Sequence, residues 1–277
     1  MRLIMSTSSK AITCRVCEAG DYLYRFEGDY RLNRCRSCGV IHLDQVYSHA
    51  EAFLSEVKVS EKLEYWGYPE YLKKYKTVFD YFFEDRYEKI MLGNPAKTNW
   101  FDFGAGYGLW MDFLKKEKRI LASGVEIEEA ASTFARSKGL AVTHSDFLDF
   151  NLPQKYNVIT VCDVLEHLEN PLAALNKCHQ ALSDGGLVYI QVPNVVGFKY
   201  PFNDHLGLPH HLWQFDPKSL FALINKAGFE MVDYWTGVQG VIGHYERGTA
   251  TFPRKMMWKM ASLLKRGNRL QMLVRKK

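Results

Sequence analysis

Strand-like and helix-like segments alternate from residue 98 to the end of this 277-residue chain, and this alternation constrains the fold more than any other feature. Seven segments have the length and composition of strands: NWFDFG, ILASGVEI, AVTHSD, YNVITVCD, GLVYIQVPN, FEMVDYWTG and RLQMLVRK. Between them lie segments with helical spacing, among them EEAASTFARSKG, PLAALNKCHQAL and PKSLFALINKAG. Such alternation is typical of an α/β fold with a parallel or mostly parallel sheet and helices on both faces.

Four of the six cysteines form two CxxC pairs, Cys14–Cys17 and Cys35–Cys38. Two such pairs separated by roughly 15 to 20 residues are typical of a structural zinc site, because each pair directs two thiolates at one point. Gly39 suits the turn with positive φ that ends the second pair. Four thiolates leave no open coordination position, so we expect Zn²⁺ to hold structure and take no part in chemistry. Disulfides would require an oxidising compartment, which no export signal supports.

The predicted organisation has three parts. Residues 1–45 form a zinc-binding module, residues 46–97 an aromatic-rich helical connector or lid, and residues 98–277 the α/β domain. No apolar run reaches the roughly 18 to 20 residues that span a bilayer, and the N-terminus lacks the apolar region of a signal peptide. We therefore expect a cytoplasmic protein.

The charge of the chain is distributed unevenly. The formal net charge is +5, but residues 246–277 carry ten Lys and Arg against one acid, which leaves 26 basic and 30 acidic residues elsewhere. The main body therefore offers little electrostatic attraction for the phosphates of nucleic acid. The basic C-terminal segment has Met256, Met260, Leu263 and Leu264 on one helical face. We expect this helix to cover the sheet edge; the alternative is a weak contact with an anionic membrane surface.

A glycine-rich turn follows the first predicted strand, in the sequence DFGAGYG of residues 102–108. Glycines let the backbone turn sharply and approach a ligand closely, and ligands of such sheets bind at the carboxyl ends of the strands. The spacing is GxGxG, and the third small residue of the dinucleotide fingerprint is replaced by Leu109. Glu126 ends the second strand, where an acid can hold ribose hydroxyls. This combination suggests an adenosyl ligand without phosphates, with Asp146 either contacting the adenine amino group or lying in a solvated turn.

In these motifs the chain resembles the class I S-adenosylmethionine-dependent methyltransferases. The resemblance covers roughly residues 100–277 and is carried by FDFGAGYG, GVEIEEAA, HSDF, VCDVLEHLENP, ALSDGGLVYIQVPN and HHLWQFDPKSLFALINKAGFE. It implies a Rossmann-like, seven-stranded, mostly parallel sheet. DVLEHLENP and HHLWQF are similar to the branch that modifies small molecules, sugars and quinone precursors, some members of which carry an N-terminal CxxC…CxxC module.

The resemblance also implies which residues contact S-adenosylmethionine. Asp102 would help to hold the ammonium group, and Glu126 would take the ribose hydroxyls. The other implied contacts are Gly104, Ala105 and Gly106 behind the methionine part, Ile127, Asp146 and Phe147 around the adenine, and Asp163 on the far side of the pocket.

Three histidines are candidates for the chemistry. A hydroxyl acceptor must lose its proton, and histidine is suited to accept it near neutral pH. His167 follows the fourth strand, and His210 and His211 lie in the long connection after the fifth strand. His167 could instead cap a short helix, and one of the adjacent pair could pack or face water.

The leading functional prediction is a methyltransferase that O-methylates a sugar or related small metabolite, in surface-glycan or natural-product biosynthesis. One alternative is C-methylation of a keto-deoxysugar, which the sequence does not separate from O-methylation. A second is ribosomal RNA methylation, which the acidic main body and the lack of a Pro-Pro-aromatic loop after the fourth strand disfavour. A third is a non-enzymatic scaffold, which the intact glycine loop and Glu126 disfavour. Neither the acceptor nor the oligomeric state follows from the sequence.

Overall fold

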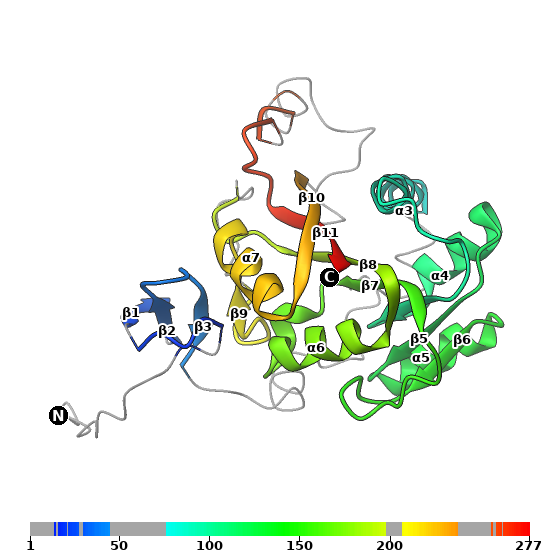
Figure 1. Cartoon of the computed structure of the whole chain (residues 1–277), viewed down its shortest axis with the longest axis horizontal. Coiled ribbons are helices and arrows are strands. Elements are labelled where there is room, and N and C mark those ends of the chain that lie inside the picture. The colour runs from blue at the N-terminus through cyan, green and yellow to red at the C-terminus, as the bar shows by residue number, and fades with distance from the viewer. Residues whose placement is uncertain are drawn as a thin grey trace, which may run out of the picture.

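The computed structural model describes residues 14, 16–20, 22–27, 30–44, 76–197, 207–237, 256, 259–261 and 263–277. Seven strands form the main sheet: β4 (Trp100–Phe103), β5 (Ala122–Glu126), β6 (Ala141–His144), β7 (Tyr156–Cys162), β8 (Leu182–Pro193), β10 (Phe229–Gly237) and β11 (Arg269–Lys276). Their order across the sheet is β10-β11-β8-β7-β4-β5-β6. The predicted seven-stranded α/β fold is therefore confirmed, and each of the seven strand-like segments supplies one strand. Figure 1 shows the strands of this sheet together with the helices that flank them.

Strand direction and order create a switch point in the middle of this sheet. The strands β4, β5, β6, β7 and β8 run parallel to one another, and β11 is antiparallel to both β8 and β10. From β4 the chain adds β5 and β6 on one side and then returns to place β7 on the other side. The carboxyl ends of β4 and β7 therefore lie next to each other, which is where ligands of open α/β sheets bind.

Helices cover both faces of the sheet, as the alternation predicts. They are α3 (Lys76–Met91), α4 (Leu109–Phe113), its π-helical continuation η2 (Leu114–Lys118), α5 (Glu129–Ser137), α6 (Pro171–Ala181) and α7 (Pro217–Lys226). Val188 and Ile190 of β8 pack in the core that includes α6 and α7, whereas Leu187 and Tyr189 pack against α3 and α4. A strand buried on both faces is a continuous apolar run, which explains the sequence LVYI at this position.

A second, four-stranded sheet contains the N-terminal segment. Its strands are β1 (Tyr22–Glu27), β2 (Tyr30–Cys35), β3 (Ile41–Leu43) and β9 (Trp213–Gln214), in that order. The strand β9 comes from the segment just before α7, and it pairs antiparallel with β3. The N-terminal module is thus joined to the main domain through a shared sheet, a connection that the sequence patterns do not predict.

The described residues of the C-terminal helical segment bear only in part on the prediction that this helix covers the sheet edge. The four apolar side chains of its predicted face are between 49% and 75% exposed; they belong to Met256, Met260, Leu263 and Leu264. Ala261 between them is buried, and the Lys265 ammonium lies 3.8 Å from the centre of the Tyr234 ring on the edge strand β10, so the cover of this edge stays a prediction. Among the helices of the described part of the chain, none has both the length and the apolar character that a membrane span requires.

Candidate functional site

The glycine loop between β4 and α4 depends on the absence of a side chain at Gly104. This residue has φ +77°, and a Cβ here would lie 2.4 Å from Cγ2 of Val164. The amides of Gly104 and Ala105 both donate to the carbonyl of Val125, at 3.0 Å. The loop therefore turns tightly over the end of β5 and packs directly against the segment that follows β7.

Glu126 at the end of β5 is held by two backbone amides. Its Oε2 accepts a hydrogen bond from the Gly106 amide at 2.7 Å, and its Oε1 accepts one from the Glu128 amide at 2.9 Å. An ionised carboxylate has about four acceptor positions, so both oxygens can still accept from vicinal hydroxyls. The structure thus brings the predicted ribose acid and the glycine loop together.

Asp102 lies beneath this loop and is buried. The Thr160 hydroxyl donates to its Oδ1 at 2.5 Å. Burial raises the pKa of Asp102 from 3.8 to about 6, although the Thr160 hydrogen bond and the positive charge of Arg86 act in the opposite direction. Arg86 is itself buried, with its guanidinium carbon 5.0 Å from the centre of the Trp110 ring. A carboxylate in such a setting is stabilised by an arriving cation, which is what an ammonium group supplies.

The residues predicted to surround the adenine fall into two groups. Ile127 is 45% exposed just after β5, and Asp146 is exposed just after β6, where its Oδ1 accepts a hydrogen bond from the Leu148 amide at 2.6 Å. Phe147 is only 3% exposed and stacks on Phe103 with ring centres 3.6 Å apart. Ile127 and Asp146 therefore have surface available to a ligand, whereas Phe147 mainly supports the core beneath them.

Asp163 follows β7 and belongs to a buried polar network that the sequence patterns do not reveal. Its backbone has φ +55°. The Gln191 side chain donates to its Oδ2 at 2.8 Å, and a guanidinium nitrogen of Arg269 lies 3.4 Å from its Oδ1. Gln191 in turn accepts a hydrogen bond from Gln271 at 3.2 Å. The only sequence signal is the presence of two glutamines within otherwise apolar strands.

Two of the three predicted histidines lie together beyond the end of β7. His167 ends the short 3₁₀ turn η3 (Leu165–His167), and its ring centre is 4.8 Å from that of His211. The Nδ1 atom of His167 lies 3.0 Å from the carbonyl oxygen of His210. A carbonyl oxygen only accepts, so Nδ1 carries the hydrogen, and Nε2 is the nitrogen that accepts a proton in the neutral ring. His210 contributes its backbone to this arrangement.

Glu166 completes the group and was not predicted from the sequence. Glu166 is 1% exposed, and neither of its carboxylate oxygens has a hydrogen-bond partner among the residues that the structure describes. Burial, reinforced by the negative charge of Asp163, raises the pKa of Glu166 well above its ordinary value. Glu166, His167 and His211 each offer an atom within 4.8 Å of the other two. Such a group can exchange a proton between acid and imidazole, and its donor atoms also suit a divalent metal ion.

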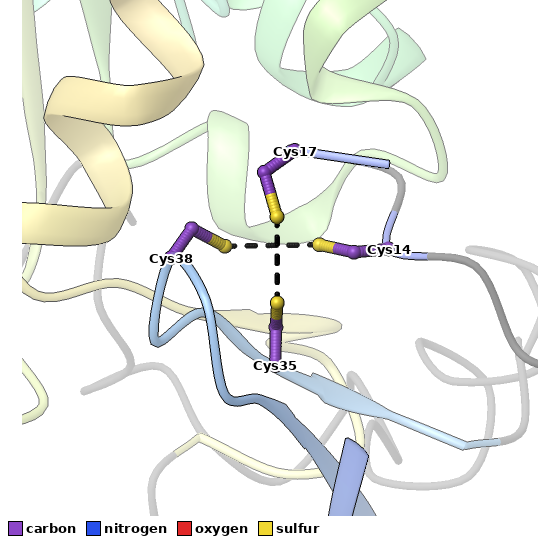
Figure 2. Close-up of side chains that lie close together, drawn as sticks. All are labelled: Cys14, Cys17, Cys35 and Cys38. Atoms are coloured by element: carbon purple, nitrogen blue, oxygen red, sulfur yellow. Dashed lines mark hydrogen bonds between the residues drawn. The ribbon is translucent and has the colours of Figure 1, made fainter. Parts of the chain in front are cut away.

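The four predicted metal ligands converge at one point (Figure 2). The Sγ atoms of Cys14 and Cys38 are 3.7 Å apart, and those of Cys17 and Cys35 are 3.4 Å apart. A disulfide requires about 2.05 Å, whereas a tetrahedral zinc ion with Zn–S bonds of about 2.3 Å places its sulfurs about 3.8 Å apart. Gly39 has φ +84°, as the turn after the second pair requires. The residues present therefore fit a tetrahedral metal ion.

Comparisons with known proteins match the central part of the chain. A family model described as a methyltransferase domain matches residues 54–234. The ubiquinone biosynthesis O-methyltransferase of Pseudomonas aeruginosa is 24% identical over 170 residues, which is 50% of this chain and 73% of that protein. The protein of the same name from Azoarcus sp. is 27% identical over 169 residues, 50% of this chain and 72% of that protein.

A solved structure supports the fold independently. The S-adenosylmethionine-dependent methyltransferase from Archaeoglobus fulgidus superimposes with a TM-score of 0.54 at 17% identity, and covers 74% of this chain and 99% of that one. At 17% identity this likeness shows only that the fold is shared. The family model, in contrast, matches more than half of the chain. The protein belongs to the methyltransferase domain family and is a methyltransferase.

Proposed function

We propose that the protein transfers the methyl group of S-adenosylmethionine to a hydroxyl oxygen of a small-molecule acceptor, a sugar or a related metabolite. The observation that supports this proposal is the group formed by Glu166, His167 and His211 beside the glycine loop. Proton-accepting side chains are needed for a hydroxyl acceptor, because oxygen must lose its proton as it gains the methyl group. A phenolic acceptor is the second candidate, since the relatives described above are named as ubiquinone biosynthesis O-methyltransferases.

The cofactor site is assigned to the carboxyl ends of β4 and β5. When bound there, S-adenosylmethionine supplies a methyl carbon that is already activated by the sulfonium group. Asp102 would hold the ammonium, Glu126 the ribose hydroxyls, and the side chains of Ile127 and Asp146 the adenine. The lack of a side chain at Gly104 lets this loop pack directly against Val164, because a Cβ there would lie 2.4 Å from Cγ2 of Val164. With the cofactor activated in this way, the protein mainly has to align the acceptor and exclude water.

The proton acceptor is assigned to the imidazole pair. The bond from Nδ1 of His167 to the His210 carbonyl fixes the tautomer in which Nε2 is basic. His211 lies beside this ring and is the second candidate base. Burial raises the pKa of Glu166, and a positive charge that develops on an adjacent imidazole would favour its ionised form.

The cysteine cluster is assigned to a structural Zn²⁺. The donor set is all thiolate, the sulfur spacing is tetrahedral, and three of the four ligands, Cys14, Cys35 and Cys38, are buried within the same core that includes α7. Such an ion contributes its binding free energy to folding, and it has no position left for a substrate.

The test is methyl transfer from S-adenosylmethionine with a labelled methyl group to fractionated small molecules and RNA. Label in nucleotide-sugar or glycan fractions supports the leading acceptor class, and label in phenolic lipid precursors supports the second. Label that disappears after ribonuclease treatment would refute both. The His167→Asn variant should lose transfer and keep S-adenosylhomocysteine binding. The matched control is His179→Asn. His179 lies near the end of the helix α6 and packs against Phe229 at the start of β10, away from the site.

A further inference from the structure

The cysteine cluster and the histidine pair are connected by an unbroken series of short contacts. Cys38 is followed within three residues by β3, whose Ile41 and His42 pair with Gln214 and Trp213 of β9. Beyond the paired residues, the Leu43 amide donates to the carbonyl of Leu212 at 2.9 Å. The residue before Leu212 is His211. The backbone next to this histidine is therefore hydrogen-bonded to β3, the strand that follows the second cysteine pair.

The side chain of Trp213 extends the connection to the other histidine. Its ring centre lies 5.3 Å from that of His42 on β3. Its Nε1 donates to the carbonyl of Leu168 at 2.7 Å, and Leu168 directly follows His167. Trp213 is 3% exposed, so the bond is shielded from water. One side chain thus contacts the N-terminal module at one end and the turn that carries His167 at the other.

Two further contacts hold the module against α7. Lys218 donates to the carbonyl of Ser37, which lies inside the second CxxC pair, at 2.7 Å. Lys226 forms an ion pair with Glu18 at 2.6 Å, but Glu18 is exposed and such pairs contribute little. The shared core contributes more, because the buried Val40 and Phe215 belong to the same cluster as Cys14 and Cys35.

Among the described residues, no hydrogen bond from the module reaches the cofactor contacts, although Phe103 and Phe147 belong to the same core cluster as the buried cysteines. Glu126 is held by the amides of Gly106 and Glu128, and Asp102 by Thr160, all within the main domain. The contacts described above instead reach Leu168, Leu212 and the N-terminal part of α7. A change in the module should therefore alter the histidine pair and leave the cofactor contacts as they are.

We propose that the metal-holding module is a positioning element for the acceptor half of the site, and that Trp213 is the residue that couples the two. The cysteine pairs fix the position of β3, and β3 fixes the position of β9 through their pairing. The strand β9, together with the Trp213 side chain, then fixes where His211 lies relative to His167. The proposal rests on the proposed function only in regarding these histidines as the acceptor side; the coupling itself is a property of the fold.

The test compares hydrogen–deuterium exchange of the full-length zinc-loaded protein with that of the Cys17→Ser variant, and its probe ligand is S-adenosylhomocysteine. Cys17 is the least buried of the four ligands, so its replacement perturbs the core least. In the variant we expect zinc content to fall and exchange in residues 207–216 to rise about fivefold to tenfold. Exchange in residues 101–108 and the affinity for S-adenosylhomocysteine should stay within about twofold of the wild type.

The Trp213→Phe variant keeps an aromatic ring against His42 and removes only the donor to Leu168. It should retain zinc, retain S-adenosylhomocysteine binding, and change the ¹⁵N chemical shifts and titration of His167 and His211. The matched control is Trp100→Phe at the start of β4. It removes a similar hydrogen bond, which the indole Nε1 of Trp100 donates to the Ala96 carbonyl at 2.9 Å. This control should leave both histidine spectra unchanged.

Three results would overturn the proposal. The first is unchanged exchange in residues 207–216 after zinc loss, and the second is unchanged histidine spectra in Trp213→Phe. Equal disturbance of the glycine loop in either variant would also contradict it, since the effect would then be global. None of these measurements needs an acceptor, so a failure here is distinct from a failure of the proposed methyl transfer.

Discussion

Replacing Asp102 by asparagine should make the protein more stable and its cofactor binding weaker. The pKa of this carboxyl is raised from 3.8 to about 6, mainly by burial. At about 1.36 kcal/mol per pKa unit, the ionised form costs the folded state about 3 kcal/mol above pH 7. Asparagine keeps an oxygen to accept from Thr160 and removes the charge. We therefore expect the ligand-free variant to gain up to about 3 kcal/mol, or about 6 °C in thermal midpoint.

The pH dependence identifies the source of this gain. A carboxyl with a raised pKa contributes stability that is fully present below pH 3.8 and is lost as the pH rises through about 6. The difference between the Asp102→Asn variant and the wild type should accordingly be constant above about pH 7 and shrink between pH 6 and pH 4. The exposed Asp149 is the matched control, because Asp149→Asn removes a carboxylate that is already in water.

Cofactor binding should change in the opposite direction. An ammonium group pairs with the ionised carboxylate, so Asp102→Asn should weaken S-adenosylhomocysteine binding about tenfold to a hundredfold at pH 8 in calorimetric titration. Wild-type affinity should fall as the pH drops below about 6, and the affinity of the variant should not. Equal affinity of the two proteins at pH 8 would refute the role of Asp102, and a stability gain that persists at pH 4 would refute the electrostatic reasoning.

Three further changes test other parts of the structure. Glu126→Gln loses one of the two amide contacts that hold the carboxylate, and should weaken S-adenosylhomocysteine binding about tenfold in the same titration; an unchanged affinity would remove Glu126 from the cofactor site. Gly207→Ala places a Cβ 2.2 Å from Nδ1 of His211, so labelled-methyl transfer should fall at least about tenfold while S-adenosylhomocysteine still binds; transfer at the wild-type rate would contradict the placement of His211. Cys35→Ser should reduce the zinc content measured by atomic spectroscopy from one ion per chain to none and lower the thermal midpoint, whereas retention of the ion would contradict the four-cysteine site.

The main domain could be predicted from the sequence because its signals are local. Most strands of the large sheet are apolar runs bounded by turn residues, and the helices α5 and α7 have a clear apolar spacing. The capping box at the start of α7, formed by Asp216 and Ser219, is one such local signal. The closeness of the GxGxG loop and Glu126 could be predicted in the same way. The loop follows one strand and Glu126 ends the next, and the carboxyl ends of parallel strands lie at one edge of the sheet.

The remaining features depend on contacts between distant residues. The strand β9 contains only Trp213 and Gln214, which is too short for any periodicity, and its partner β3 comes from the N-terminal module. Glu166 is buried and has no hydrogen-bond partner among the described residues, and this too is invisible in the motif DVLEH, where an acid beside a histidine suggests an exposed turn. The position of Arg86 among aromatic rings depends on the packing of α3 against α4 and β8.

The late partner of β3 has a consequence for the order in which the chain folds during synthesis. About 170 residues separate Leu43 from Trp213, so at roughly 5 to 20 residues per second the ribosome needs roughly 10 to 35 s to deliver β9. Throughout this interval the N-terminal sheet has an open edge, which can pair with another nascent chain. The large sheet has a shorter delay of the same kind, because β11 follows the end of β8 by about 76 residues and inserts between β8 and β10. Early capture of zinc would keep the module folded during the wait, so zinc starvation during expression should increase aggregation of newly made protein more than it harms protein that has already folded.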